Sequence, residues 1–368
     1  MRIGIHYHGL LYDFQDHKHS WIDTPDGHRY GRPILIKELL KRGHDVFILS
    51  RGREEIAFRL SCDDGGLGVS YSNKCFYDNH EDPELDVVFL EYRWPTWKND
   101  RTHPQHDPSR YEPDLDRQRD VIETYRGNTP IIAWDTDLKV TPEFEELHPE
   151  LILADPSLET NRLTRDRVSL PFWTDWEQLL PVAEPYPVYG YVGNRYEREE
   201  QFQKYYFYSQ NMLRAAGIQT TMHGNWLQTS PERGSPQDLI RENTNVAFGH
   251  RMNFFDSMCL MNRFVCTTHV SKQSYYETGF VSPRYLEALA VGCPALVPEE
   301  MTSGPAGDLL GRKSVVGNHV GVWSLVGSIA SMTLTQRIEL IEEQRSTLKE
   351  RGLFSVSHVA DFIESVAR

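Results

Sequence analysis

The stretch SPRYLEALAVGCPALV, residues 282–297, contains the signals for a short helix followed by a strand. Ser282 is a common N-cap residue, and Pro283 suits the first helical position, where its missing N–H has no partner to lose. Gly292, followed by Cys293 and Pro294, is typical of a helix end. The stretch therefore predicts a well-defined helix that leads into a strand.

Two charged residues on this helix point to a ligand. Arg284 stands in the first turn, where the partial positive charge of a helix N-terminus disfavours a cation unless an anion binds there, and phosphate is the natural anion. Glu287 shares its side of the helix, and its carboxylate can accept hydrogen bonds from two sugar hydroxyls. A ribose next to a diphosphate would satisfy both residues. The alternative is an ion pair on the helix surface.

Length and charge limit the classes of protein to consider. The chain has 368 residues, enough for two domains, with 39 Lys and Arg against 53 Asp and Glu and a net charge of −14. Such a chain is not a general binder of nucleic acid or anionic membrane, although a local basic groove is compatible with it. No run approaches the roughly 20 apolar residues of a membrane span, and MRIGIHYHG leads directly into a strand. We therefore expect a cytoplasmic protein.

Cysteine and histidine give little support for a disulfide framework or a metal site. The five cysteines are odd in number and scattered, which suits a reducing compartment. The 15 histidines include the runs HYH, DHKH and HPQH, but zinc ligands occur at short, repeated spacings of Cys and His. Cys62 and Cys75 are too isolated to complete such a set. We expect no bound metal.

Continuous apolar runs recur along both halves of the chain, as in parallel strands buried on both faces. In the first half, RPILIKELLKRGH between two such runs has helical spacing, which gives a β-α-β unit without a GxGxxG motif. After the proline-rich stretch 180–188, strands and helices alternate again. We predict an α/β fold with two Rossmann-like, doubly wound domains that face each other across a cleft. The predicted domains are 1–179 and 180–332, and helices in 333–368 pack back on them.

The motifs of the second half resemble those of a known family. YVGNRYERE, MHGNW, FFDSMCLMNRFV and SPRYLEALAVGCPALV occur in the order seen in GT-B glycosyltransferases. The last block is similar to the R-x-x-E-A-L-A-x-G-x-P signature of the family-one-like group that includes spore-maturation glycosyltransferases. The resemblance covers about 188–298. It implies a nucleotide-sugar donor, UDP- or GDP-linked, held by the C-terminal domain.

The resemblance also implies roles for individual residues. Arg284 would meet the donor phosphates and Glu287 the ribose, Gly193-Asn194 would form a turn close to the diphosphate, and His223-Gly224 would lie near the base or the phosphates. The remaining candidates on the donor side are Ser282, Tyr285, Arg198 and Arg251, of which the two arginines could stabilise a departing diphosphate without a metal.

One departure from the family concerns stereochemistry. Many retaining members carry a second glutamate eight residues before the ribose-binding one, and here that position is Gly279, with Glu277 the nearest glutamate. An inverting transfer needs a base beside the acceptor hydroxyl. Asp137 is the favoured candidate, with Asp135, His8 and Glu91 as the others at predicted strand ends. The alternative for the two aspartates is turn formation or N-capping after a strand.

The acceptor is left open by the sequence. The long loop 94–120 is rich in Arg, His, Tyr and Trp, and with 10–32 it is expected to border the acceptor. Its Arg110, Arg117 and Arg119 are candidate acceptor-side residues, since phosphate contacts need only a local basic patch. A glycan, a small molecule and a hydroxymethylated pyrimidine in DNA, as modified by some bacteriophage glycosyltransferases of this fold, are all compatible.

Two other classes of function compete with transfer. A sugar-nucleotide epimerase would use acidic and histidine side chains in the donor domain, where His223 and His250 are available. An inactive nucleotide-sugar binding protein is disfavoured by the retained Arg284 and Glu287. For the assembly, we expect a monomer or a weak dimer without a membrane span.

Overall fold

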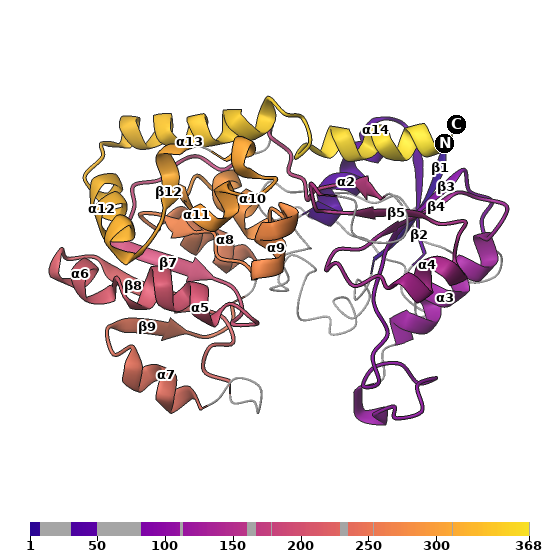
Figure 1. Ribbon diagram of the computed structural model, residues 1–368. Coiled ribbons are helices and arrows are strands. Elements are labelled where there is room, and N and C mark those ends of the chain that lie inside the picture. The colour runs from indigo at the N-terminus through magenta and orange to yellow at the C-terminus, as the bar shows by residue number, and fades with distance from the viewer. Residues whose placement is uncertain are drawn as a thin grey trace. The chain divides into compact units, whose positions relative to one another are not determined.

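The computed structural model describes residues 1–7, 31–49, 82–110, 113–159, 167–177, 179–228, 235–252, 254–310 and 312–367. They form two compact units (Figure 1). The first comprises the described residues up to Pro171 together with Val356–Arg368, and the second comprises Phe172–Ser355. His8, one of the predicted catalytic residues, lies outside the described residues, and so does the side chain of Arg110.

The described part of the first unit contains a parallel six-stranded sheet in the order β2-β1-β3-β4-β5-β6. β1 is apolar in its middle and β3 along all but its last residue, and Ile3, Ile5 and Val87–Leu90 are fully buried. Such strands need cover on both faces. The strands are β1 (Arg2–His6), β2 (Asp45–Ile48), β3 (Val87–Glu91), β4 (Ile131–Trp134), β5 (Ile152–Asp155) and β6 (Val168–Ser169).

The helices of the first unit include the last one of the chain. α14 packs against α2, where Arg42 Nη1 lies 2.6 Å from Asp361 Oδ1 and 3.1 Å from Glu364 Oε1. His44 Nε2 lies 2.8 Å from the same Glu364 oxygen. These contacts tie the C-terminus to the start of the sheet. The helices are α2 (Gly31–Lys41), η4 (Pro108–Arg110), α3 (Pro113–Tyr125), α4 (Pro142–Leu147) and α14 (Val356–Val366).

The second unit contains two parallel three-stranded sheets, β7-β8-β9 and β10-β11-β12. A parallel bridge between Tyr189 and Cys266 joins β7 to the segment that leads into β10. The strands therefore run in the order β9-β8-β7-β10-β11-β12. They are β7 (Val188–Val192), β8 (Gln219–His223), β9 (Val246–Gly249), β10 (Thr267–Thr268), β11 (Ala295–Pro298) and β12 (Val315–Val316). The predicted α/β class with parallel sheets is confirmed in both units.

Helices connect these strands, with α12 packed against α6 and α13 packed against α10. The helical segment from Glu199 to Ala215 is interrupted by a π-helical turn, after which Ser209 Oγ bonds back to the carbonyl of Tyr205. The elements are α5 (Glu199–Phe202), η5 (Gln203–Phe207), α6 (Gln210–Ala215), α7 (Pro236–Glu242), α8 (Phe254–Asn262), α9 (Gln273–Thr278), α10 (Pro283–Ala290), α11 (Glu299–Thr302), η6 (Gly307–Leu309), η7 (Arg312–Ser314), α12 (His319–Ala330) and α13 (Leu334–Lys349).

α13 fixes the helix predicted from the 282–297 stretch. Buried Arg345 donates to the carbonyl of Leu289 at 2.9 Å and 2.6 Å, which satisfies the C-terminal end of α10. Gln344 exchanges hydrogen bonds with both backbone groups of Ala295, at the start of the following strand. The helix and strand predicted from this stretch are therefore present and held in place by one neighbouring helix.

The boundaries differ from the predicted division of the chain. The second unit begins at Phe172, and α13 belongs to it, whereas α14 belongs to the first unit. No helix in the described parts of the chain combines the length and apolar character needed to cross a membrane.

Candidate functional site

The N-terminus of α10 lacks a side-chain cap. Ser282 has an extended backbone, with φ −71° and ψ 155°, but its hydroxyl makes no capping hydrogen bond. Ser282 Oγ lies 3.3 Å from Nδ1 of His269 instead. A helix start whose N–H groups are not taken by a side chain is a ready-made site for an anion.

Arg284 and Glu287 form an ion pair on this helix. Arg284 Nη1 donates to Glu287 Oε2 at 2.6 Å. The Glu287 side chain is fully buried and that of Arg284 is 19% exposed, so this is not a solvated surface pair. Burying a carboxylate costs free energy that a single arginine only partly offsets. The arrangement therefore supports a role for the pair beyond surface charge.

His269, directly after β10, is a site residue that sequence reasoning missed. Its side chain is buried, and its ring lies against Tyr285 with 5.3 Å between ring centroids. Burial, and next the nearby positive charge of Arg198, lower the pKa of His269 to about 3. The available signal was a histidine directly after the apolar run RFVCTT, at the same sheet edge as the predicted donor residues.

The loops that follow β7 and β8 are fastened to each other at the carboxyl edge of the sheet. The N–H of Gly193 donates to the carbonyl of His223 at 2.8 Å, and Trp226 Nε1 donates to the carbonyl of Gly193 at 3.0 Å. Gly224 has φ 146°, and a Cβ there would lie 2.1 Å from the Gly193 oxygen. Only glycine fits this close approach.

Asn194 and Arg198 extend this contact. Arg198 Nη1 donates to the carbonyl of Asn194 at 3.1 Å, and Asn194 Oδ1 accepts from the N–H of Asn225 at 3.4 Å. His223 is half-buried, and burial lowers its pKa. The two predicted glycine turns and Arg198 are thus brought together, with Arg198 close enough to His269 to affect its charge.

The remaining donor-side candidates lie in different surroundings. Tyr285 is buried, and burial raises its pKa. It lines a small cavity of about 10 Å³ together with His269, Arg284 and Tyr191. That volume is about the space of a single water molecule. Arg251 is exposed after β9.

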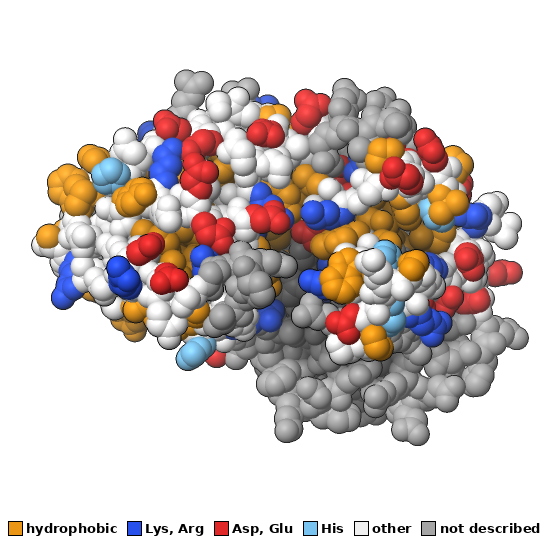
Figure 2. Space-filling view, turned by 60° about the horizontal axis from the view of Figure 1, so that its bottom comes forward, with side chains coloured by type: hydrophobic (Ala, Val, Ile, Leu, Met, Phe, Trp, Pro, Cys, Tyr) orange, Lys and Arg blue, Asp and Glu red, His pale blue; other side chains and the backbone are white. Residues whose placement is uncertain are grey.

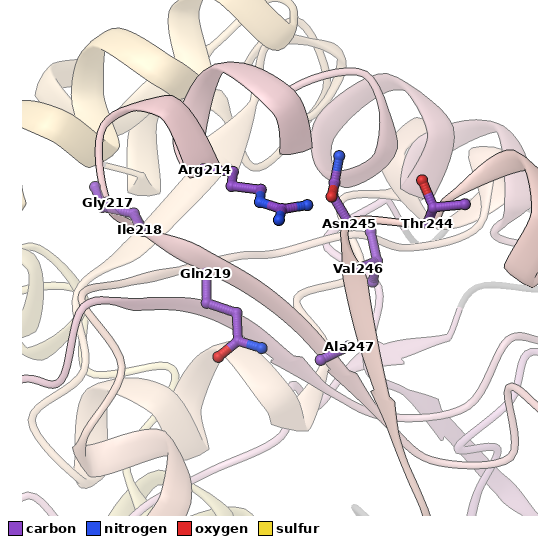
Figure 3. Close-up of a pocket in the computed structure, with 8 residues that line it drawn as sticks. All are labelled: Arg214, Gly217, Ile218, Gln219, Thr244, Asn245, Val246 and Ala247. Carbon is purple, nitrogen blue, oxygen red and sulfur yellow. The ribbon is translucent and has the colours of Figure 1, made fainter.

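A larger hollow lies elsewhere in the second unit. It has a volume of about 480 Å³ and opens at the amino ends of β8 and β9, where Gln219 and Val246 line it. Arg214 is the charged residue of its lining and points toward Asn245 (Figure 3). In open α/β sheets, ligands bind outside the carboxyl ends of the strands. This hollow is therefore separate from the predicted donor residues.

In the first unit, Asp135 and Asp137 follow β4 in unlike environments. Asp135 is buried, and its two oxygens accept from the N–H groups of Lys139 at 2.8 Å and Val140 at 2.7 Å. Burial raises its pKa. Arg167 Nη1 lies 3.3 Å from Asp135. These contacts make Asp135 the residue that closes the loop, which fits the turn-forming alternative.

Asp137 lies within the loop that Asp135 closes, and its side chain is partly exposed. Leu138 beside it has φ 58°, a left-handed conformation that is strained for leucine. Such strain persists where the surrounding structure imposes it, and it is common at functional sites. Of the two aspartates, Asp137 has the better access to an acceptor.

Glu91, at the carboxyl end of β3, is taken up by an ion pair. Arg32 donates to both of its oxygens, with Nε at 2.9 Å and Nη2 at 2.5 Å, and both side chains are buried. Next to them, His6 is fully buried, and neither of its ring nitrogens has a hydrogen-bond partner among the described residues. Burial, then Arg117 and Arg32, lower its pKa to about 3. Glu91 is better suited to fixing Arg32 than to accepting a proton.

The acceptor-side candidates Arg117 and Arg119 already bond to other groups of the first unit. Arg119 Nη2 lies 2.5 Å from Asp100 and its Nη1 lies 3.5 Å from Asp116. Arg117 Nε donates to the carbonyl of Leu49 at 2.7 Å. Figure 2 shows acidic side chains among the basic ones on the face it presents. Arg117 and Arg119 are thus less available for phosphates than the sequence suggested.

No cluster of three or more His, Cys, Asp or Glu side chains suited to a metal ion occurs among the described residues. On the donor side, Gly193, Asn194, Arg198 and Gly224 meet at the loops after β7 and β8, and Ser282, Arg284, Tyr285 and Glu287 lie at the start of α10, whereas Arg251 is exposed after β9. Asp137, Asp135 and Glu91 belong to the first unit.

Comparison with known proteins identifies the fold. No family model matches the sequence, and no curated protein matches it. Among solved structures, T4 phage beta-glucosyltransferase is 13% identical with a TM-score of 0.60, covering 100% of this chain and 99% of that chain. An alpha-glucosyltransferase in complex with UDP-glucose and DNA containing an abasic site is 12% identical with a TM-score of 0.62, covering 100% of both chains. Sucrose-phosphate synthase from Thermosynechococcus elongatus is 12% identical with a TM-score of 0.55, covering 100% of this chain and 96% of that chain. The neighbours are GT-B glycosyltransferases, so the predicted GT-B fold is confirmed.

Proposed function

We propose that this protein is a glycosyltransferase that moves a sugar from a nucleoside-diphosphate sugar, preferably a UDP-sugar, to an acceptor hydroxyl. The observation that carries the proposal is the start of α10, where an N-terminus without a side-chain cap bears Arg284 and the buried Glu287. The neighbours of the same fold include complexes with UDP and with UDP-glucose. These support uridine as the base of the donor.

The donor-side residues have separate roles in this proposal. The N–H groups at the start of α10, with Arg284 and Arg198, stabilise the negative charge that develops on the departing diphosphate. Glu287 accepts hydrogen bonds from the ribose hydroxyls. Its ion pair with Arg284, at 2.6 Å, holds the carboxylate in one orientation before the donor arrives. Gly193 and Gly224 let the backbone of two loops come close to the donor.

We propose Asp137 as the base that takes the proton of the acceptor hydroxyl, with inversion at the sugar carbon. Gly279 ends α9 with φ 69°, so a glutamate at that position would be strained. Glu277 bonds with Gln273 on the exposed surface of the same helix. The neighbours include a beta- and an alpha-glucosyltransferase, so the fold does not select between the two outcomes.

Independence of a metal ion is also part of the proposal. Arg284, Arg198 and a helix N-terminus supply the positive charge that a divalent ion would otherwise provide. One T4 phage neighbour is a complex with UDP and Mn²⁺, so the point needs its own test. Transfer rates are measured after EDTA treatment and again after addition of Mn²⁺ or Mg²⁺. Unchanged rates support independence, and a rate that falls with EDTA and returns with Mn²⁺ contradicts it.

The function itself is tested by turnover. The protein is incubated with UDP-glucose and other UDP-sugars, with and without candidate acceptors, and free UDP and the sugar product are followed. Release of UDP that depends on an acceptor supports transfer. Conversion of the sugar without an acceptor would identify an epimerase, and binding of UDP without turnover over all acceptors would identify a binding protein.

DNA is a second candidate for the acceptor. It is favoured by one observation, the match over the whole length of this chain to an alpha-glucosyltransferase bound to DNA. Lys98 lies over the ring of Trp97, and Trp97 is 46% exposed, so this pair offers a base-stacking surface with a cation beside it.

The test of a DNA acceptor is transfer to hydroxymethylated DNA over a range of salt concentrations. With DNA as the acceptor, the rate at low substrate falls steeply with salt, and Lys98→Ala reduces the slope by about one unit if it contacts one phosphate. Arg119→Ala is the comparison, because its charge is already paired with Asp100. Transfer that shows no salt dependence would exclude DNA.

A further inference from the structure

The hydroxyl of Ser282 occupies a position from which a serine normally caps a helix. Three other helices of the second unit have such a cap: Ser235 of α7, Asn318 of α12 and Thr333 of α13 each accept a hydrogen bond from a backbone N–H. Ser282 has the same extended backbone, but its Oγ points to His269 Nδ1 at 3.3 Å. A partner outside the helix therefore holds this hydroxyl.

The burial and ring contacts of His269 suit it to be that partner. Its side chain is 3% exposed and rests edge-on against Tyr285, and its Nε2 has no hydrogen-bond partner among the described residues. Burial and the nearby Arg198 lower its pKa to about 3, so the ring is neutral at ordinary pH. Its ring lines a small cavity with Arg284 and Tyr285, so packing rather than charge sets its position.

The hydroxyl and a phosphate would compete for the same donors. Pro283 at the first helical position has no N–H, and the N–H of Tyr285 at the third position already donates to the carbonyl of Ser282 at 3.1 Å. This leaves the N–H of Arg284 at the second position. A serine cap accepts from the N–H of the second or third helical position, and here the second is the one left open. A phosphate at a helix N-terminus uses the same groups. With so few donors, a capped Ser282 would remove part of the site.

We propose that His269 is a positioning residue that holds the Ser282 hydroxyl away from the start of α10 and so keeps the N–H of Arg284 open for the donor diphosphate. This inference rests on the proposed function and adds a residue that acts on the donor through another side chain. His269 does not contact the reacting atoms.

The test is a set of UDP dissociation constants measured by calorimetry. His269→Phe keeps a ring against Tyr285 but removes the partner of Ser282, and it is expected to weaken UDP binding about fivefold, which is the equivalent of a serine cap of about 1 kcal/mol. Removing the competing hydroxyl as well, in His269→Phe/Ser282→Ala, is expected to restore affinity toward that of the unsubstituted protein. His269→Asn, whose Oδ1 takes the place of Nδ1, is expected to bind UDP better than His269→Phe.

A second variant gives the same test without altering His269. Asparagine is a strong neutral cap with a longer side chain, so Ser282→Asn is expected to raise the melting temperature and weaken UDP binding. Asn318→Ala removes the cap of α12 in the same unit and controls for a general loss of stability.

The outcomes separate the inference from the function on which it rests. A double variant that binds UDP as weakly as His269→Phe would overturn the inference, and so would equal affinities in all the variants or an equal loss in Asn318→Ala. If the unsubstituted protein binds neither UDP nor a UDP-sugar, the proposed function is overturned and this inference with it.

Discussion

Arg284 and Glu287 form an ion pair of 2.6 Å in which the acid is fully buried and the base is partly exposed. The two partners therefore depend on each other unequally. Removing Arg284 leaves a buried carboxylate without its arginine, whereas removing the charge of Glu287 leaves an arginine that water can reach. This asymmetry changes what is expected of the two substitutions.

Arg284→Ala is expected to weaken UDP binding by about 1.5–3 kcal/mol, the range for hydrogen bonds to charged groups, and also to lower the melting temperature. Glu287→Gln keeps the shape of the side chain, so we expect weaker UDP binding with a smaller loss of stability. Calorimetry and thermal melts of both variants measure these effects. Lys313→Ala, which removes an exposed ion pair with Glu343 in the same unit, is the control. If both variants melt early while UDP affinity per folded molecule stays the same, the pair is structural.

A nucleoside diphosphate is expected to raise the melting temperature, and nicotinamide dinucleotides are not. The phosphate site is a helix N-terminus with an arginine, and a ligand at one hundred times its dissociation constant adds about 2.7 kcal/mol of stability. UDP, GDP and NAD(H) are compared in one series of melts, with Arg284→Ala as the control. A shift with NAD(H) and none with UDP or GDP would contradict the proposed donor.

Local signals in the 282–297 stretch were sufficient to predict α10 and the strand behind it. The cap residue, the proline and the glycine end are properties of a few neighbouring residues, and so is the i,i+3 spacing of Arg284 and Glu287. The order of the strand runs likewise predicted the parallel α/β fold. Neither property depends on how distant segments pack.

What the sequence did not predict depends on distant contacts. The pairing of Ser282 with His269 joins two segments that meet only after the sheet forms, and the burial of Glu287 is a result of packing around α10. Arg119, which the sequence suggested as a free basic residue, forms an ion pair with Asp100. The attachment of α14 to the first unit rests on Arg42 and His44, far away in the sequence.

Asp137→Asn is expected to reduce transfer by roughly 10²–10⁴-fold, because it removes the base while leaving the donor site of the second unit intact. UDP binding should persist in this variant, and the product of the unsubstituted protein should have the inverted anomeric configuration. Turnover rates, UDP calorimetry and NMR of the product measure these three properties. Retention of configuration together with full activity of Asp137→Asn would contradict the assignment.

Asp135→Asn provides the matched comparison for that experiment. Its carboxylate accepts from two backbone N–H groups and lies by Arg167, so we expect lower stability toward urea as the main effect. A stable Asp135→Asn protein that has lost transfer, beside an active Asp137→Asn, would reverse the two roles.

Acidification is expected to destabilise both units through His6 and His269. Burial lowers the pKa of each imidazole to about 3, from about 6.5 in the unfolded chain, so the folded state binds fewer protons between these values. The stability of each unit is therefore complete above about pH 6.5 and falls as the pH drops through that value toward 3, by up to about 1.4 kcal/mol per pH unit for each histidine.

The measurement is the urea unfolding free energy at a series of pH values from 7 down to 4. His6→Asn removes the contribution of the first unit and His269→Asn that of the second, so each variant should show a shallower loss of stability than the unsubstituted protein, whatever its stability at pH 7. The control is His103→Gln, because His103 is exposed and its replacement removes no buried imidazole. Equal slopes in all four proteins would mean that both imidazoles accept protons in the folded state as readily as in the unfolded chain. That result would contradict the pKa values lowered by burial.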